Sequence, residues 1–297
     1  ILVPPTTHNL CKTPCLNAAV VSVPRDMEPS LIFSTQAEIR RLKLTGDPWP
    51  GNSFLDLLNS TALEFIFNNH SVCYVHHNHS KASLVCANID DFTQRTELKS
   101  RSTLLEFESV QQMAMDWVSR NWYLLDDQRE IILVCTEHLE WCNILLEHDL
   151  GKPRAVALDP TRGYMFFTKW GHSSPMLERC RMDGSDRKPI VDVKIVYPYG
   201  VTVDYPTQQI YWVDTYLDFV ERVDYEGKHR KTILRGLSMQ NLYGISVFEN
   251  KLYLSSWYSN DILRLDKFTK KADVLYKETS RPFNIHVYHR QRHPIGE

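Results

Sequence analysis

A short apolar motif recurs along the chain at intervals of 40 to 52 residues, and this repeat constrains the fold more than any other feature. Each copy places a small or polar residue, an apolar residue and then, in most copies, an acidic or aromatic residue in sequence. Intervals of this length are typical of the four-stranded blades of β-propellers. In the copies TALEF, MAMDW, VALDP, VTVDY, ISVFE and IHVYH, that third residue is Glu64, Asp116, Asp159, Asp204, Phe248 and Tyr288. Six copies predict six blades.

The residues between the copies supply three further strands for each predicted blade. If each copy is strand A, a polar turn then leads into a strand B rich in aromatic and β-branched residues, such as YLLD from 123 and YWVD from 211. Strand C ends at an Asp-Gly turn in the clearest repeats, at Gly184 and Gly227, and a short strand D follows. No segment of the sequence has a sustained helical period, which argues against an α/β fold. The sequence therefore predicts an all-β, six-bladed β-propeller of four-stranded blades.

The two ends of the repeat array complement each other. Residues 31–35, a segment from Glu38 and another from Phe54 have the pattern of strands B, C and D with no strand A before them. Residues 284–288 have the pattern of a strand A with nothing after it. We therefore expect the N- and C-terminal strands to form the sixth blade together, which closes the ring and removes exposed sheet edges. The expected propeller spans residues 30–290, between a Pro-rich lead-in over 1–29 and a C-terminal linker over 291–297.

Charge and hydropathy exclude two classes of partner or location for this segment. The formal charge of −2 provides no basic field for nucleic acid. No apolar run approaches the length of about 20 residues that a membrane-spanning helix needs. The chain begins at Ile1 without a signal-peptide pattern, so we expect a segment of a longer mature protein.

Several motifs resemble the YWTD-type propellers of the low-density lipoprotein receptor family. They are Tyr211–Asp214 (YWVD), Phe166–Lys169 (FFTK) followed by Trp170-Gly171, and the turn Met182–Ser185 (MDGS). The resemblance covers roughly residues 30 to 294. It implies the extracellular portion of a cell-surface endocytic receptor, with extracellular protein ligands and adjacent EGF-like and ligand-binding modules as partners. It also implies that residues 1–29 could be the remnant of an EGF-like module.

The chain departs from the family at the Asp that ends the motif. That Asp is kept at Asp126 and Asp214 and is replaced at the other four positions, by Thr35, His76, Lys169 and Ser256. In the family this Asp helps to tie neighbouring blades together. Four of the six joints between blades are therefore expected to depend on other contacts.

Four of the seven cysteines have positions that suit disulfides. Cys73 and Cys86 flank a predicted B–C hairpin, and Cys135 and Cys142 flank a predicted C–D hairpin, so each pair can face across two antiparallel strands. Buried free thiols are the alternative for each pair. Cys180, on a predicted strand C, is expected to be a buried, unpaired thiol. Cys11 and Cys15 lie in the lead-in, and their pairing stays open.

Three sequons mark potential N-glycosylation sites at Asn59, Asn69 and Asn78. Glycans at Asn59, in a D–A connection, and Asn78, in a B–C loop, would shield one rim of the first blade and leave the third to fifth blades open. The nearby histidines His70, His76, His77 and His79 could suggest a metal site, but a solvated loop is the more common origin of such a cluster. We expect no metal and no cofactor.

Enzymatic motifs are absent from the sequence. It contains no GxSxG, HExxH or phosphate-binding glycine loop, and the cysteines lack zinc-site spacing. The starts of the predicted A strands are apolar or small, unlike the carboxylate-lined channel of a metal lactonase. A propeller fold alone does not fix function. We therefore expect a protein without enzymatic activity.

Aromatic residues indicate a binding face. Trp117, Trp122 and Trp212 fall on predicted strands A and B, where packing between blades accounts for them. Other aromatic residues follow strand B or precede strand A, at the same end of the ring, where exposed aromatics favour protein binding. The candidate ligand-binding residues of this upper face are Trp170, His172, Tyr199, Tyr216, Asp218, Tyr243, Trp257 and Tyr258.

The leading hypothesis is a ligand-binding and scaffolding propeller of an endocytic receptor ectodomain. The alternative is a structural spacer that contacts only neighbouring modules of its own receptor. Histidine titrates between extracellular and endosomal pH, so His286, His289 and His293, near the expected module boundary, are candidates for a pH switch that aids ligand release. His172 on the upper face is a further candidate.

Overall fold

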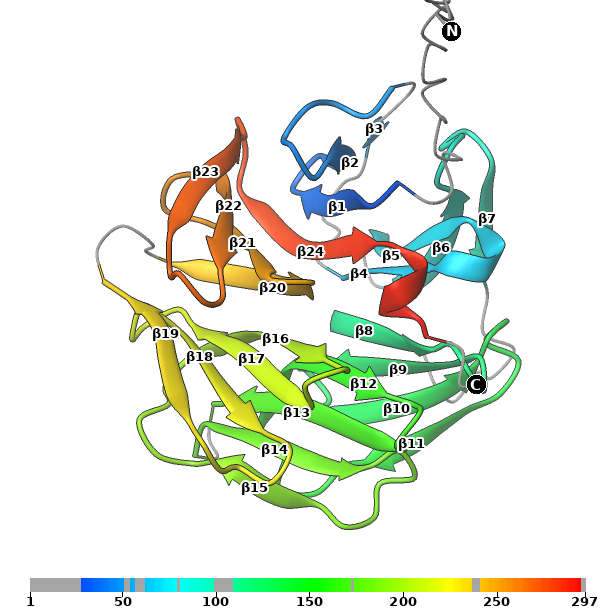
Figure 1. The fold of residues 1–297 in the computed structure, drawn as a ribbon. Helices are drawn as coiled ribbons and strands as arrows, with labels where there is room; N and C mark the ends of the chain where they lie inside the picture. The colour runs from blue at the N-terminus through cyan, green and yellow to red at the C-terminus, as the bar shows by residue number, and fades with distance from the viewer. Residues whose placement is uncertain are drawn as a thin grey trace, which may run out of the picture.

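The computed structural model describes residues 28–50, 54–56, 62–78, 81–98, 109–171, 174–236 and 241–294. They form six separate four-stranded antiparallel sheets arranged around a common centre (Figure 1). The described helical segments are two short 3₁₀ turns, η2 (Phe67–Asn69) and η3 (Arg290–Arg292). No helix among these residues is long and apolar enough to span a membrane. The prediction of an all-β propeller with six blades is confirmed.

The first three blades follow the chain in order, and each is listed here from strand A to strand D. Blade 1 consists of β4 (Leu63–Ile66), β5 (Ser71–Asn78), β6 (Lys81–Asn88) and β7 (Arg95–Leu98). Blade 2 consists of β8 (Val110–Asp116), β9 (Asn121–Asp126), β10 (Ile131–Thr136) and β11 (Cys142–Leu146). Blade 3 consists of β12 (Lys152–Asp159), β13 (Tyr164–Trp170), β14 (Met176–Arg181) and β15 (Lys188–Val191).

The remaining blades include the one that closes the ring. Blade 4 consists of β16 (Pro198–Asp204), β17 (Gln209–Asp214), β18 (Phe219–Asp224) and β19 (Lys231–Arg235). Blade 5 consists of β20 (Leu242–Phe248), β21 (Lys251–Ser256), β22 (Asp261–Asp266) and β23 (Ala272–Lys277). Blade 6 consists of β24 (Pro282–Tyr288), β1 (Ser30–Thr35), β2 (Glu38–Lys43) and β3 (Phe54–Asp56).

The predicted closure of the ring by the two chain ends is confirmed. β24, red in Figure 1, lies beside β1, blue, and pairs with it antiparallel, with Leu31 opposite Val287 and Ile32 opposite His286. The innermost strands then contact one another in a closed cycle from β4 through β8, β12, β16, β20 and β24 back to β4. The pairing gives β24 and β1 the backbone partners that each would otherwise lack at a sheet edge.

The hydrophobic core lies between neighbouring blades. Trp122 on β9 and Trp212 on β17 are fully buried, and the Trp122 indole donates a hydrogen bond to the Glu137 carbonyl at 3.0 Å. Both belong to apolar clusters that join residues of two blades, as expected from their positions in strand B. Trp117 differs, because it follows β8 in the turn to β9 and its indole donates a hydrogen bond to the Pro294 carbonyl at 2.9 Å.

The end of strand B shows how the blades are joined with and without the motif Asp. The Asp214 carboxylate accepts hydrogen bonds from the backbone N–H groups of Val196 and Tyr197, at 2.7 and 3.1 Å, in the connection from blade 3. At the equivalent position of blade 3, the Lys169 ammonium donates to the carbonyl of Asp149, in the connection from blade 2, at 2.5 Å. The Lys169 ammonium, a hydrogen-bond donor, thus stands where the motif has a carboxylate acceptor. In both blades the side chain binds the backbone of the connection from the preceding blade.

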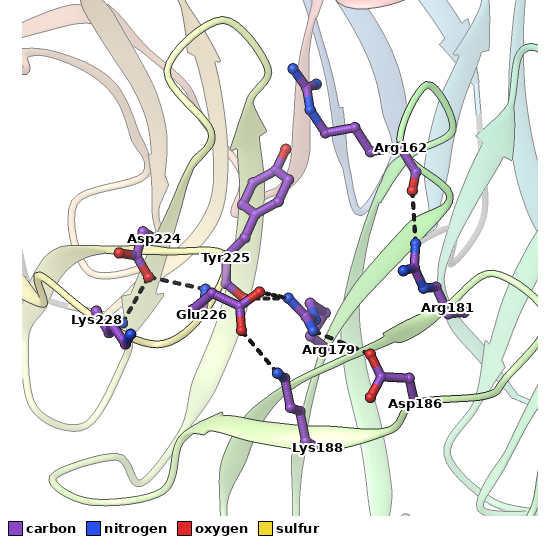
Figure 2. Close-up of polar contacts among 9 residues, drawn as sticks. All are labelled: Arg162, Arg179, Arg181, Asp186, Lys188, Asp224, Tyr225, Glu226 and Lys228. Atoms are coloured by element: carbon purple, nitrogen blue, oxygen red, sulfur yellow. Dashed lines mark hydrogen bonds and ion pairs between the residues drawn. The ribbon is translucent and has the colours of Figure 1, made fainter.

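Ion pairs add to the joint between blades 3 and 4 (Figure 2). Arg179 on β14 pairs with Glu226 in the β18–β19 turn of the next blade, and Lys188 on β15 reaches the same carboxylate at 2.9 Å. The Arg179 guanidinium also lies 4.5 Å from the ring centroid of Tyr164. Since Arg179 is buried, these contacts compensate for the loss of water around its charge.

Candidate ligand-binding face

The B–C loops and D–A connections of all blades share one end of the ring, called here the upper face; the A–B and C–D turns form the lower face. On the upper face, aromatic rings from blades 3 to 6 make a continuous set of contacts. We call this set the upper-face aromatic cluster. Its members are Trp170, Tyr197, Tyr199, Tyr216, Tyr243, Trp257 and Phe283.

The cluster extends across the connections between blades. Trp170, at the end of β13, meets Tyr197 edge to face, with ring centroids 5.2 Å apart, and Tyr197 meets Tyr216 at 5.7 Å. Tyr199 on β16 contacts Tyr243 on β20 at 5.6 Å. Such tilted and edge-to-face contacts are the favoured geometries for aromatic pairs, so the rings support one another.

A buried arginine lies beneath these rings. The Arg154 guanidinium lies 4.6 Å from the ring centroid of Tyr199 and 4.7 Å from that of Tyr243, and it donates hydrogen bonds to the Tyr243 hydroxyl and the Gln111 side-chain carbonyl. Burial raises the pKa of Tyr243, so its hydroxyl stays protonated. Arg154 thus fixes the floor of the cluster through cation–π contacts and hydrogen bonds.

The predicted binding residues divide into exposed and supporting groups. Tyr216 and Tyr258 are 66% and 70% exposed, and so are available to a partner. Tyr243 is only 2% exposed and lies under the surface. The Asp218 carboxylate accepts a hydrogen bond from the backbone N–H of Asn241 at 3.2 Å, which ties two loops together. His172 lies outside the described residues.

Three participants were not among the predicted residues. Tyr197 and Phe283 complete the aromatic contacts, and Arg154 lies below them. The segment YPYG before Val201 carries a signal for Tyr197, because it places two tyrosines next to the start of a predicted strand A. Arg154 and Phe283 carry no comparable local signal.

Two of the histidines predicted to act as pH switches, His286 and His293, are packed among side chains of the ring and not exposed at a module boundary. β24 places His286 on the inner side of the ring, 3.7 Å from a Glu64 carboxylate oxygen, and burial, with the nearby positive charge of Arg292, lowers the pKa of His286 to about 4. The His293 ring stacks between Phe65 and Trp117, with centroids 4.3 and 4.8 Å away. Burial and Arg292 lower the pKa of His293 well below its ordinary value.

The lowered pKa values favour neutral rings at His286 and His293 and so argue against a switch at these two residues between extracellular and endosomal pH. His289 is different. Its ring lies 5.1 Å from that of Phe248 and accepts a hydrogen bond from the backbone N–H of Gln291 at 3.3 Å. Its role as a pH switch stays a prediction.

Both predicted disulfides are present. Cys73 and Cys86 are directly opposite each other on β5 and β6, and Cys135 and Cys142 on β10 and β11, with Cα atoms 4.0 and 4.1 Å apart. Cys180 is a buried free thiol, as expected. Cys11 and Cys15 lie outside the described residues.

The predicted glycosylation sites differ in position. Asn69 is exposed in the A–B connection of blade 1, on the lower face, and Asn78 ends β5. Asn59 lies outside the described residues. Glycosylation stays a prediction for all three.

The described residues include a cavity but no metal-binding group, and the cavity lies apart from the aromatic cluster. In the described ranges, no group of three or more His, Cys, Asp or Glu side chains is placed to hold a metal ion. His70 instead has its Nδ1 atom 3.3 Å from the Tyr288 hydroxyl. A cavity of about 660 Å³ opens on the lower face, between Phe248, Phe268 and Arg292, and its wall includes the ion pair of Asp204 with Lys267. The cavity lies at the opposite end of the ring from the aromatic cluster. This hollow and the connected aromatic rings are therefore on different faces.

Comparisons with known proteins agree with the architecture. Residues 163–205 match the family model described as low-density lipoprotein receptor repeat class B. The chain is 30% identical over 277 residues to the vitellogenin receptor Yl of Drosophila melanogaster, a match that covers 93% of this chain and 14% of that receptor. It is 37% identical over 176 residues to the vitellogenin receptor of Solenopsis invicta, covering 59% of this chain and 10% of that receptor. The chain thus spans a small part of the length of these relatives.

The solved structure of a nidogen/laminin complex contains a chain with the same fold. The TM-score is 0.76 at 23% identity, and the match covers 88% of this chain and 98% of the other. The sequence also suggests a particular likeness to the first propeller of low-density lipoprotein receptor-related protein 1, which stays a prediction. The expected location, outside the cell as part of a surface receptor, agrees with the receptor relatives. With its repeat match, its receptor relatives and its six four-stranded blades, the chain is a YWTD-type propeller of the low-density lipoprotein receptor family.

Proposed function

We propose that this propeller binds extracellular proteins through the upper-face aromatic cluster, as part of an endocytic receptor ectodomain. The observation that carries the proposal is the set of connected aromatic rings over blades 3 to 6, with Tyr216 exposed at its edge. Aromatic and arginine side chains are enriched in the energetically important parts of protein interfaces. Because the rings pack on each other and on Arg154, a partner would meet a surface that is already ordered.

The setting supports an extracellular role. Two disulfides in one propeller favour an oxidising compartment. Both vitellogenin receptors are named for a protein ligand, and vitellogenin is therefore the first ligand to test. We infer that the chain acts by binding and not by catalysis, since the relatives are receptors. A contribution to pH-dependent release would rest on His289 or His172.

The test is surface plasmon resonance with the immobilised propeller and vitellogenin, followed by a screen of other extracellular proteins. The double variant Tyr216→Ala/Tyr258→Ala removes two exposed rings from the upper face, and the ring contact that it removes is the one between Tyr216 and Tyr197. We expect it to weaken binding about tenfold or more, equal to about 1.4 kcal/mol. Phe268→Ala is the matched control, because Phe268 is 76% exposed on the lower face.

The alternative, a spacer that contacts only adjacent modules, predicts that the isolated propeller retains no extracellular protein. It has some structural support, because Trp117 and Phe65 hold His293 where the chain leaves the ring. Equal loss of binding in the upper-face variant and in Phe268→Ala would move the site away from the aromatic cluster. Retention of nothing would favour the spacer.

A further inference from the structure

We propose that an N-linked glycan on Asn69 packs against the exposed indole of Trp141 and covers the joint between blades 1 and 2 on the lower face. This site is at the opposite end of the ring from the proposed ligand-binding face. It does not depend on the proposed function.

Trp141 is presented by a rigid hairpin of blade 2. The hairpin between β10 and β11 is closed by the Cys135–Cys142 disulfide, and Thr136 donates a backbone hydrogen bond to the Trp141 carbonyl at 2.9 Å. The Trp141 side chain is nevertheless 75% exposed. Within the described residues, no aromatic ring contacts it. A single exposed apolar side chain is common on protein surfaces, so exposure alone does not indicate a site.

Asn69 from the neighbouring blade reaches the same hairpin. Its side-chain amide donates a hydrogen bond to the Glu137 carboxylate at 3.2 Å, and Glu137 directly follows Thr136, the residue hydrogen-bonded to Trp141. Glu137 is in turn held by Arg120, whose Nε donates to it at 2.6 Å. Hydrogen bonds from Arg120 lower the pKa of Glu137, so the acceptor is a carboxylate at neutral pH. The glycan acceptor and the exposed indole therefore meet at one hairpin.

The sequon Asn69-His70-Ser71 supplies the chemistry. In glycosylation, Asn69 Nδ2 forms a bond to C1 of the first sugar, the bond from C1 to the pyrophosphate of a lipid-linked oligosaccharide breaks, and the amide loses one proton. One N–H remains on Nδ2. That group can still donate to Glu137, which would direct the first sugars along the hairpin. Sugar rings present C–H groups that pack favourably on the electron-rich face of an indole.

A glycan on Asn69 fits the surface around Trp141 better than a protein partner does. A glycan is covalently fixed beside the hairpin, so its local concentration at Trp141 is high without any separate binding step. The indole would then be covered in the secreted protein. A protein partner on Trp141 is the competing outcome, and it predicts an indole that stays accessible in the isolated glycoprotein.

The experiment uses the propeller secreted from eukaryotic cells. Mass spectrometry should find a glycan on Asn69, and hydroxyl-radical footprinting should modify Trp141 severalfold less before enzymatic removal of the glycans than after it. Tyr258 on the upper face should be modified equally in both samples. Asn78→Gln removes a different sequon of the same blade and should leave Trp141 protected.

Two variants separate the glycan from effects on folding. Asn69→Gln and Ser71→Ala both abolish the sequon, and each should expose Trp141 to the extent seen after deglycosylation. Enzymatic removal acts on the folded protein, so its result stands even where a variant fails to fold. An unoccupied Asn69, or equal modification of Trp141 with and without the glycan, would overturn the proposal.

Discussion

The indole of Trp257 stacks on the ring of Tyr243, with centroids 4.5 Å apart and planes at 21°. The same indole donates a hydrogen bond to the Pro282 carbonyl at 2.8 Å, in the first residue of β24. Trp257 therefore connects blade 5 to the strand that closes the ring. It belongs to the candidate ligand-binding face and to the packing between blades at once.

Replacing Trp257 should lower stability as well as binding. We expect Trp257→Ala to lower the free energy of unfolding by about 2 kcal/mol or more, because it removes the stack and leaves the Pro282 carbonyl without its donor. Tyr258→Ala is the control, since its exposed ring should cost less than about 0.5 kcal/mol. Urea unfolding followed by circular dichroism measures both. Identical transitions for the two variants would contradict a structural role for Trp257.

Lys169 provides a test of how blades join without the motif Asp. Its ammonium lies 3.0 Å from the Glu178 carboxylate, and both side chains are buried. Lys169→Ala should cost about 2 kcal/mol, because the buried Glu178 carboxylate and the Asp149 carbonyl each lose one donor, while Arg187 still donates to both. Lys169→Asp should be worse than Lys169→Ala, although Asp is the family residue there, since it brings a second carboxylate to Glu178.

The control for Lys169 is Lys188→Ala, which removes a half-exposed lysine of the same blade that pairs at the surface with Glu226 of blade 4. Exposed ion pairs contribute little, so its cost should stay below about 1 kcal/mol. Chemical denaturation of the four proteins ranks them. If Lys169→Asp were as stable as the unmodified protein, the joint would not depend on the charge at this position.

The sequence predicted what local patterns determine. Strand periodicity and Asp-Gly turns identified the blades, and the incomplete first and last repeats identified the closure by β24 and β1. Cys73 and Cys86 could be paired because they flank one hairpin symmetrically. Each of these features depends on residues that are near in sequence or on a pattern that repeats.

Features that depend on contacts between blades were missed. Arg154 lies under Tyr243, 89 residues away, and no local motif marks that pair. His293 was assigned to a linker, where a histidine would be solvated, but the chain folds back so that its ring stacks on Phe65. Burial then changes its protonation. The sequence located the aromatic residues at one end of the ring, whereas it could not tell which rings are exposed and which support them.

The low pKa of His286 predicts how the free energy of unfolding changes in acid. The groups that face it are Glu64, Arg292 and His293. Its pKa is about 4 in the folded state against 6.5 when unfolded, so the unfolded state binds more protons in between. The folded state should therefore lose stability as pH falls from 6.5 to 4, by roughly 3 kcal/mol at most for this group.

His286→Gln should reduce that loss, because Gln has no proton to gain on unfolding. Unfolding by urea at several pH values between 4 and 7 measures the difference. His229→Gln is the control, since His229 is exposed beside Asp224. Parallel stability curves for His286→Gln and the unmodified protein would show that burial does not suppress protonation of His286.

Glu64 should make the opposite contribution at higher pH. Burial raises its pKa to about 8, against the opposing effects of the Phe65 backbone N–H, 2.9 Å from the carboxylate, and the charge of Arg292. A carboxyl whose pKa is raised in the folded state contributes stability that is fully present below its unfolded pKa of 4.5 and is lost as pH rises through about 8.

Glu64→Gln keeps a neutral side chain that can accept the same hydrogen bond. We therefore expect it to match the unmodified protein near pH 4.5 and to be more stable above pH 8, by a few kcal/mol at most. Glu249→Gln, at an exposed carboxylate of the lower face, should show no such divergence. If Glu64→Gln were less stable than the unmodified protein at every pH, the carboxyl would be ionised in the folded state and stabilised by Arg292.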